Sequence, residues 1–126
     1  MSRRQVILIV EDDDDLRGVF AMTLSFDGFD VHEARTGFEA LRFIDTNPPD
    51  LVVLDLGLPG IDGYAVQQEI AANAFTRHIP VVIVTASAKD LSHLDVACVL
   101  RKPVSPEELI VTVRRCLAGG APITGA

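Results

Sequence analysis

The sequence predicts an α/β domain built on a five-stranded parallel sheet. Short apolar, β-branched runs alternate with segments of helical periodicity, and three of these runs are almost wholly apolar. Central parallel strands covered by helices on both faces are expected to be apolar throughout. Strands that alternate with helices across short loops favour one sheet with right-handed crossovers. The predicted strands are Val6–Val10, Phe29–Glu33, Leu51–Leu54, Val81–Val84 and Cys98–Leu100.

The segments between these runs carry helix signals. Apolar residues recur at helical spacing after the first strand, and Gly28 ends that helix. These apolar residues are Leu16, Val19, Phe20 and Leu24. Thr36 and Glu39 form a capping box, and Asp62 can cap the next helix. The segment 105–108 starts the last helix with a serine cap, a proline and a glutamate three residues after the serine.

The second strand and the interval before the fifth differ from the rest. Phe29–Glu33 alternates apolar and polar residues, which is typical of an edge strand. Only sixteen residues separate Thr85 from Lys102. An average helix of about 11–12 residues does not fit there beside a strand and two loops. We therefore expect the fourth helix to be one or two turns around Asp90–Leu94, or absent.

Composition restricts the class of protein. A chain of 126 residues with 48% hydrophobic residues fits one globular domain, and the net charge of −7 argues against direct nucleic-acid binding. No apolar run approaches the ~20 residues of a membrane span, and the N-terminal run is too short for a secretion signal. Cys98 and Cys116 are predicted to be buried free thiols in a reducing cytoplasm. We expect a domain over residues 1–118 and a flexible tail or linker over 119–126.

Polar residues follow four of the predicted strands. Glu11 and Asp12 come after the first strand, Asp55 after the third, Thr85 after the fourth and Lys102 after the fifth. Ligands of open α/β sheets bind beyond the carboxyl ends of the strands, so these groups are expected to meet at one edge. Asp13 to Asp15 are interpreted instead as a solvated helix start favoured by the helix dipole.

The charges of these residues indicate phosphoryl chemistry. Asp12 and Asp55 are oxygen ligands suited to Mg²⁺, Glu11 can hold a metal-bound water, and a carbonyl after Asp55 can complete the shell. Lys102 and the Thr85 hydroxyl would hold a phosphate oxygen. A carboxylate nucleophile, a metal, an ammonium and a hydroxyl are what phosphoryl transfer requires.

With these motifs the chain resembles the receiver domain of bacterial two-component response regulators over residues 4 to 117. The matching stretches are Val6–Asp13, Asp50–Gly63, Ile79–Ala86 and Arg101–Pro103. The resemblance implies a flavodoxin-like sheet of strand order 2-1-3-4-5. It also implies a cis peptide between Lys102 and Pro103, and a cytoplasmic regulator that is not an enzyme but assists its own phosphorylation and dephosphorylation.

The resemblance further implies a role for each site residue. Asp55 would accept a phosphoryl group from a phosphohistidine on a sensor kinase or a phosphotransfer protein, and the domain would then change its contacts with an unknown downstream protein. Mg²⁺, or Mn²⁺ in its place, would bind Glu11, Asp12, Asp55 and the Gly57 carbonyl. Phosphoryl oxygens would be held by Thr85, Lys102 and the Ala86 backbone amide.

Two features depart from the family's pattern. Val99 stands three residues before the lysine, where the family commonly has an aromatic residue that moves inward with the threonine. The Gly-Ala-Asp-Asp stretch before the last strand is missing, and the interval is about five residues shorter than usual. Gly57 and Ser87 occupy positions whose side chains often tune the lifetime of the acyl phosphate. Our hypothesis is an intact phosphorylation site with an unconventional output face.

The same sequence features bear on three other functions. A dehalogenase-like phosphatase needs a second aspartate where this chain has Gly57. A flavin-binding module needs a phosphate-binding loop where this chain has five acidic residues, Glu11 to Asp15. An inactive receiver-like docking domain is the main alternative. The sequence leaves open whether the chain is a stand-alone regulator, a relay, or part of a longer protein.

Overall fold

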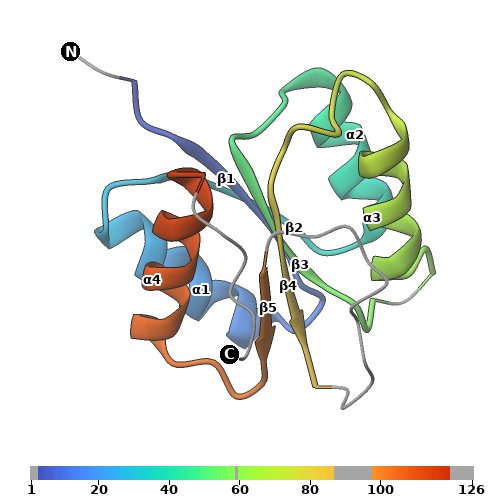
Figure 1. Cartoon of the computed structure of the whole chain (residues 1–126). Coiled ribbons are helices and arrows are strands. Elements are labelled where there is room, and N and C mark those ends of the chain that lie inside the picture. Colours follow the sequence, from blue (N-terminus) through green and yellow to red (C-terminus); the bar gives the residue numbers. More distant parts are fainter. Residues whose placement is uncertain (1–2, 59, 87–97, 120–126) are drawn as a thin grey trace.

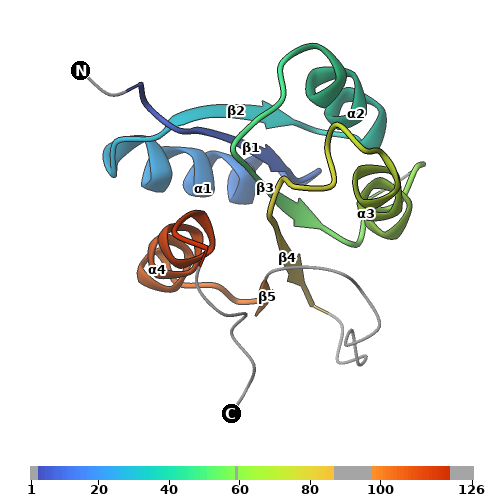
Figure 2. The ribbon, with the colours of Figure 1, turned by 45° about the horizontal axis from the view of Figure 1, so that its top comes forward.

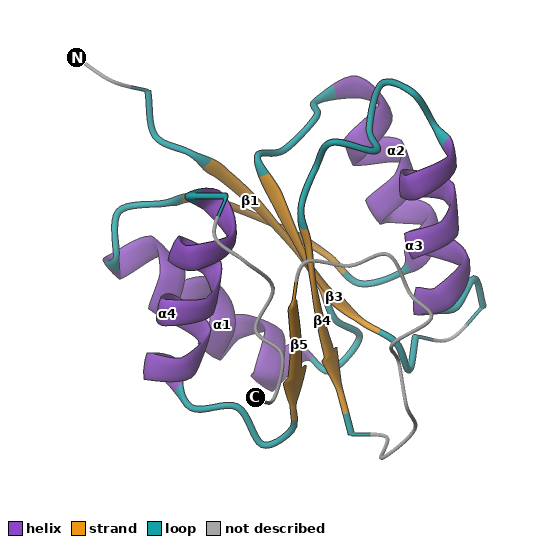
Figure 3. Cartoon of the chain, viewed as in Figure 1, coloured by secondary structure: helices purple, strands orange, loops and turns teal. Residues whose placement is uncertain are grey.

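A parallel five-stranded sheet forms the centre of the protein (Figures 1 and 3). The computed structural model describes residues 3–58, 60–86 and 98–119. The strand order is β2-β1-β3-β4-β5, as the sequence predicted. The elements are, in chain order, β1 (Val6–Val10), α1 (Asp14–Phe26), β2 (Asp30–Ala34), α2 (Gly37–Thr46), β3 (Leu51–Asp55), α3 (Gly63–Ala72), β4 (Val81–Thr85), β5 (Cys98–Arg101) and α4 (Pro106–Leu117).

Helices cover both faces of the sheet. Helices α1 and α4 lie on one face and α2 and α3 on the other, and Figure 2 shows the same layers from another side. Each central strand sends alternate side chains into the two layers. In β1, Leu8 packs in the cluster beneath α2 and α3, whereas Ile7 and Ile9 pack beneath α1 and α4. Both clusters are apolar, which explains the continuous apolar runs of β1, β3 and β4.

The register aligns the carboxyl ends of the strands. Val10 of β1 pairs with Leu54 of β3, so the residues that follow each of them lie at the same level. Asp55 in turn pairs with Val84 of β4, and Thr85 pairs with Arg101 of β5. This register brings the ends of β1, β3, β4 and β5 to one edge of the sheet.

Side-chain caps start helices α1 to α4. The side chains of Thr36, Asp62 and Ser105 accept hydrogen bonds from backbone amides three residues on, at 2.9–3.1 Å, which confirms the three predicted caps. Asp13 caps α1 through the Leu16 amide at 3.1 Å, in keeping with its interpretation as part of a helix start. Gly28 follows α1 with φ +98°, a conformation that glycine adopts without strain.

Several strand boundaries differ from the prediction by one residue. Strand β2 covers 30–34 rather than 29–33, because backbone pairing with β1 continues to Ala34 while Phe29 packs in the core. Strands β3, β4 and β5 each extend one residue further than predicted, to Asp55, Thr85 and Arg101. Apolar patterning locates a buried strand but does not reveal how far its backbone hydrogen bonds continue.

The structure also bears on the predictions for the two cysteines, the Lys102–Pro103 peptide and a membrane span. Cys98 and Cys116 are buried and free, as predicted. The peptide between Lys102 and Pro103 is cis, as the family resemblance implied. The short helix expected around Asp90–Leu94 lies outside the described residues. Among the helices of the described ranges, none has the length and apolar character needed to cross a membrane.

Candidate functional site

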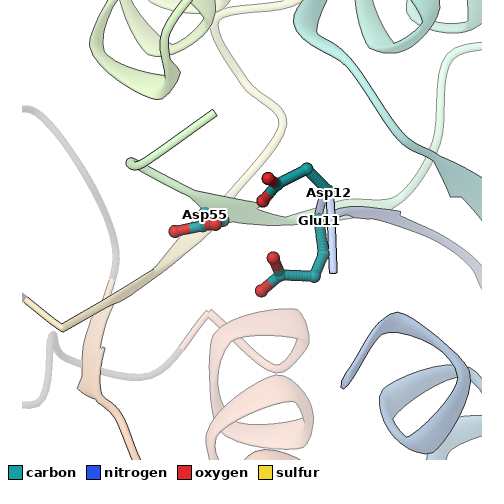
Figure 4. Close-up of side chains that lie close together, drawn as sticks. All are labelled: Glu11, Asp12 and Asp55. Atoms are coloured by element: carbon teal, nitrogen blue, oxygen red, sulfur yellow. The ribbon is translucent and has the colours of Figure 1, made fainter. Parts of the chain in front are cut away.

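Three carboxylates converge at the carboxyl edge of the sheet (Figure 4). Glu11 and Asp12 follow β1 directly, and Asp55 is the last residue of β3. One oxygen atom from each of the three carboxylates lies within 4.8 Å of the other two. Glu11 and Asp55 are only 2% and 6% exposed, while Asp12 lies at the surface. The sequence-predicted acidic cluster is thus assembled by the strand register.

Lys102 places an ammonium group against two of these carboxylates. Its Nζ atom lies 3.0 Å from Glu11 Oε1 and 3.5 Å from Asp55 Oδ2. The Lys102 backbone amide donates to the Thr85 carbonyl oxygen at 2.8 Å, which ties the lysine to the end of β4. One ammonium cannot neutralise three ionised carboxylates, so the cluster is suited to a further cation.

The buried position of Glu11 changes its acidity. Burial, together with the neighbouring Asp55, raises the pKa of Glu11 from 4.5 to about 7, although hydrogen bonds from Lys102 and the Asp13 amide oppose this shift. Burial alone would lower the pKa of Lys102, but its hydrogen bond to Glu11 and the charges of Asp55 and Glu11 raise the pKa overall. At neutral pH the ammonium is therefore charged, whereas Glu11 is poised between its two protonation states.

Backbone amides hold the carboxylates in place. The Gly57 amide donates to Asp55 Oδ1 at 3.0 Å, and the Asp13 amide donates to Glu11 Oε2 at 3.2 Å. Asp55 Oδ1 is thus held from the loop that follows β3, while Oδ2 faces Lys102. These contacts restrict the rotation of the Asp55 side chain.

A cavity of about 490 Å³ opens over these side chains. All seven residues that the sequence placed in the site line it, together with three residues that the sequence did not assign to it, Asp13, Leu56 and Tyr64. Tyr64 lies in the first turn of α3, after the Asp62 cap. This position could have assigned Tyr64 to the site from the sequence, because a helix that follows β3 must begin near the same edge of the sheet. The seven predicted residues are Glu11, Asp12, Asp55, Gly57, Thr85, Ala86 and Lys102.

The donor set fits a hard divalent cation. Carboxylate and carbonyl oxygens are the ligands that Mg²⁺ and Mn²⁺ take in proteins. The three clustered carboxylates provide such oxygens on a half-open edge, where room remains for water and for a phosphoryl group. Because the negative charge of the carboxylates exceeds the positive charge of the single lysine, a divalent cation would be attracted to this edge.

Comparison with known proteins gives the family. The family model of the response regulator receiver domain matches residues 7–114, so this chain belongs to the response regulator receiver domain family. Receiver domains are phosphoacceptor switches of two-component signalling and act as regulators rather than as classical enzymes. The chain therefore has the fold and the acidic edge of a signalling domain that receives phosphoryl groups.

Curated relatives include proteins about twice as long. The chain is 35% identical over 121 residues to the probable transcriptional regulator ycf27 of Porphyridium aerugineum. The aligned region covers 91% of this chain and 49% of that protein. It is 35% identical over 124 residues to the response regulator MprA of Mycobacterium sp. (strain KMS), covering 94% of this chain and 53% of that protein. The chain thus spans about half the length of the curated relatives it matches.

Solved structures share the fold closely. A putative response regulator from Chloroflexus aurantiacus J-10-fl superposes with a TM-score of 0.86 at 33% identity, over 92% of this chain and 99% of that one. The signal receiver domain of a signal transduction histidine kinase from Syntrophus aciditrophicus gives a TM-score of 0.85 at 30% identity, over 91% of each chain. Both likenesses extend over nearly the whole of this domain.

Proposed function

We propose that Asp55 is the phosphoacceptor of this receiver domain. A carboxylate oxygen of Asp55 attacks the phosphorus of a phosphohistidine, the N–P bond breaks, and the imidazole leaves as an acyl phosphate forms on Asp55. The single observation that carries this proposal is the position of Asp55: a nearly buried carboxylate that faces Lys102 at 3.5 Å and opens into the cavity. Hydrolysis of the acyl phosphate would reset the domain.

The acidic cluster supports a divalent cation as cofactor. Glu11, Asp12 and Asp55, with the Gly57 carbonyl, would hold Mg²⁺ or Mn²⁺. When bound, the ion offsets negative charge on the transferring phosphoryl oxygens. Glu11 must be ionised to contribute, and its raised pKa makes its contribution dependent on pH.

The remaining site residues are suited to hold the phosphoryl group. Thr85 ends β4 beside Asp55, because Asp55 pairs with Val84. The Thr85 hydroxyl, the Ala86 amide and the Lys102 ammonium would each donate to a phosphoryl oxygen. In the unphosphorylated protein Lys102 is paired with Glu11 and Asp55, so phosphorylation would redistribute its contacts.

Membership of the family supports a proposal for the phosphodonor and for the output. We propose that a sensor histidine kinase or a histidine phosphotransfer protein phosphorylates Asp55 in the cytoplasm, and that an unknown downstream protein recognises the phosphorylated domain. The domain would span residues 1–118, with 119–126 as tail or linker.

Val99 pairs with Ile83 in the β4–β5 register and has no aromatic ring, so β5 lacks the aromatic residue that commonly moves inward with the threonine in this family. This supports an unconventional output face, and amide exchange with and without a phosphoryl mimic tests it; a response confined to the family's usual fourth-helix region would contradict it.

An inactive docking domain is the alternative, and one experiment separates the two. The full chain is incubated with acetyl phosphate and Mg²⁺, and the phosphorylated fraction is measured by intact-protein mass. Wild-type protein should gain one phosphoryl group, and Asp55→Asn and samples in chelator should not. Failure to label wild-type protein, or equal labelling of Asp55→Asn, would reject the proposed function.

A further inference from the structure

Tyr64 lines the site cavity but has no part in the function proposed above. Among the described residues that line the cavity, it is the only aromatic one. Its side chain is half-buried and packs against the core cluster beneath α2 and α3. Tyr64 therefore has two environments at once, a polar cavity that contains Asp55 and an apolar core.

The backbone around Tyr64 is tied closely to that of Asp55. The Gly63 amide donates to the Leu56 carbonyl oxygen at 3.2 Å. A Cβ atom at Gly63 would lie 2.5 Å from the Leu56 Cα and closer still to the Asp55 carbonyl oxygen, so only glycine allows this approach. The start of α3 thus rests on Asp55, which ends β3, and on Leu56, which follows it, so a change at Asp55 has a short path to Tyr64.

The apolar cluster that Tyr64 packs against is also contacted from β5. Both Tyr64 and Val99 are partly buried residues that pack against the same apolar cluster, which contains Leu54 and Ile83. Val99 cannot supply a ring from β5, but Tyr64 supplies one from α3. A ring at the boundary between cavity and core is sensitive to charge in the cavity, because it is large, rigid and amphipathic.

We propose that Tyr64 is the aromatic residue that couples the occupancy of Asp55 to α3. A phosphoryl group brings roughly −1.5 to −2 units of charge and three acceptor oxygens into the cavity that the ring lines. The ring then shifts relative to the core cluster, and α3, which carries it, responds. Tyr64 is a positioning residue in this scheme, and the inference rests on phosphorylation of Asp55.

The chain provides its own probe for this movement. Tyr64 is its single tyrosine and the sequence has no tryptophan, so tyrosine fluorescence reports one side chain. The full chain is treated with acetyl phosphate and Mg²⁺ while fluorescence, acrylamide quenching and intact mass are followed together. We expect the emission intensity to change in proportion to the phosphorylated fraction and the quenching to fall, with no change in Asp55→Asn.

Variants distinguish coupling from simple filling of the cavity. Amide exchange of α3 is compared with and without phosphorylation in Tyr64→Phe, which keeps the ring, and in Tyr64→Leu, which removes it. Phosphorylation should alter the exchange of α3 in wild type and in Tyr64→Phe but not in Tyr64→Leu. Phe75→Leu is the matched control, because Phe75 is an aromatic residue beyond the far end of α3 that is 84% exposed, and it should behave as wild type.

The outcomes separate the role of Tyr64 from the role of Asp55. Phosphorylated wild-type protein with unchanged tyrosine fluorescence, or a Tyr64→Leu variant whose α3 still responds, would overturn the role of Tyr64 and leave Asp55 as phosphoacceptor. The fluorescence result needs no variant at position 64, so it decides the matter even when Tyr64→Leu does not fold. Absence of labelling at Asp55 would reject both proposals.

Discussion

The Lys102 ammonium lies 3.0 Å from a carboxylate oxygen of Glu11, although the two residues are 91 positions apart in the chain. Glu11 follows β1, and Lys102 follows β5 at the edge of the sheet, with β3 and β4 between them. The long lysine side chain therefore spans the carboxyl edge. The ammonium group also pairs with Glu11 and Asp55, which are carboxylates that a divalent cation would need as ligands.

Removing Lys102 is expected to strengthen magnesium binding. An ammonium and a metal ion that share carboxylates repel each other, and even partial relief of this repulsion, about 1.4 kcal/mol, corresponds to ~10-fold in affinity. Lys102→Met should therefore lower the dissociation constant for Mg²⁺ in calorimetric titration. Arg77→Met removes the same charge from an exposed residue outside the cavity lining and should change affinity by less than about twofold. Equal affinities in all three proteins would show that Lys102 does not compete with the metal.

Glu11 is expected to make the metal-free protein less stable as the pH rises. Its pKa is raised from 4.5 to about 7 on folding. Between these values the folded state retains a proton that the unfolded chain releases, so the free energy of unfolding falls as pH increases through this window. Urea unfolding in chelator should show this decline. Glu11→Gln, which does not titrate, should have a flatter profile.

Magnesium should abolish this pH effect. Binding requires ionised Glu11, so the affinity for Mg²⁺ increases with pH up to about 7 and levels off above it. With the metal bound, Glu11 is ionised in the folded and in the unfolded protein above pH about 4.5, so the metal-saturated protein is expected to keep its stability where the metal-free protein loses it. Parallel pH profiles with and without Mg²⁺ would contradict a metal site that includes Glu11.

A methyl group at position 63 is expected to displace the backbone that carries Asp55 and to destabilise the protein. The added Cβ would overlap the backbone of Asp55 and Leu56, and overpacking of this kind costs about 1–3 kcal/mol. Gly63→Ala should lower the urea midpoint by a matching amount. Gly18→Ala is the control, since a Cβ on that α1 glycine meets nothing within 4 Å and should stabilise the helix by about 0.5–1 kcal/mol. Similar effects of both substitutions would refute the close approach at Gly63.

A large side chain at position 57 is expected to prolong the acyl phosphate. A Cβ there would lie 3.7 Å from Asp55 Oδ1, an ordinary contact, so longer side chains can extend over the carboxylate without backbone strain. Gly57→Leu should exclude water from the phosphorylated Asp55 and lengthen its lifetime several-fold. The phosphorylated fraction is followed by intact mass after the donor is removed. Gly57→Ala should stay close to wild type, and a shorter lifetime in Gly57→Leu would contradict the argument.

The main features of the fold were predictable because each has a local cause. Apolar runs located four strands of the sheet and an alternating run located the second, and the caps at Thr36, Asp62 and Ser105 located three helix starts. The ends of the strands were less predictable. Thr85 and Asp55 belong to their strands because hydrogen bonds from neighbouring strands continue that far, and such pairing depends on residues distant in sequence.

For the site, the sequence alone determined which groups gather at the sheet edge, because each follows a strand and parallel strands end together. It did not reveal Tyr64, whose place in the cavity depends on how α3 rests against Asp55 and Leu56. Nor did it reveal that Lys102 faces Glu11 more closely than Asp55, or that burial raises the pKa of Glu11. Distances and desolvation are properties of the packed chain, so only the tertiary structure decided them.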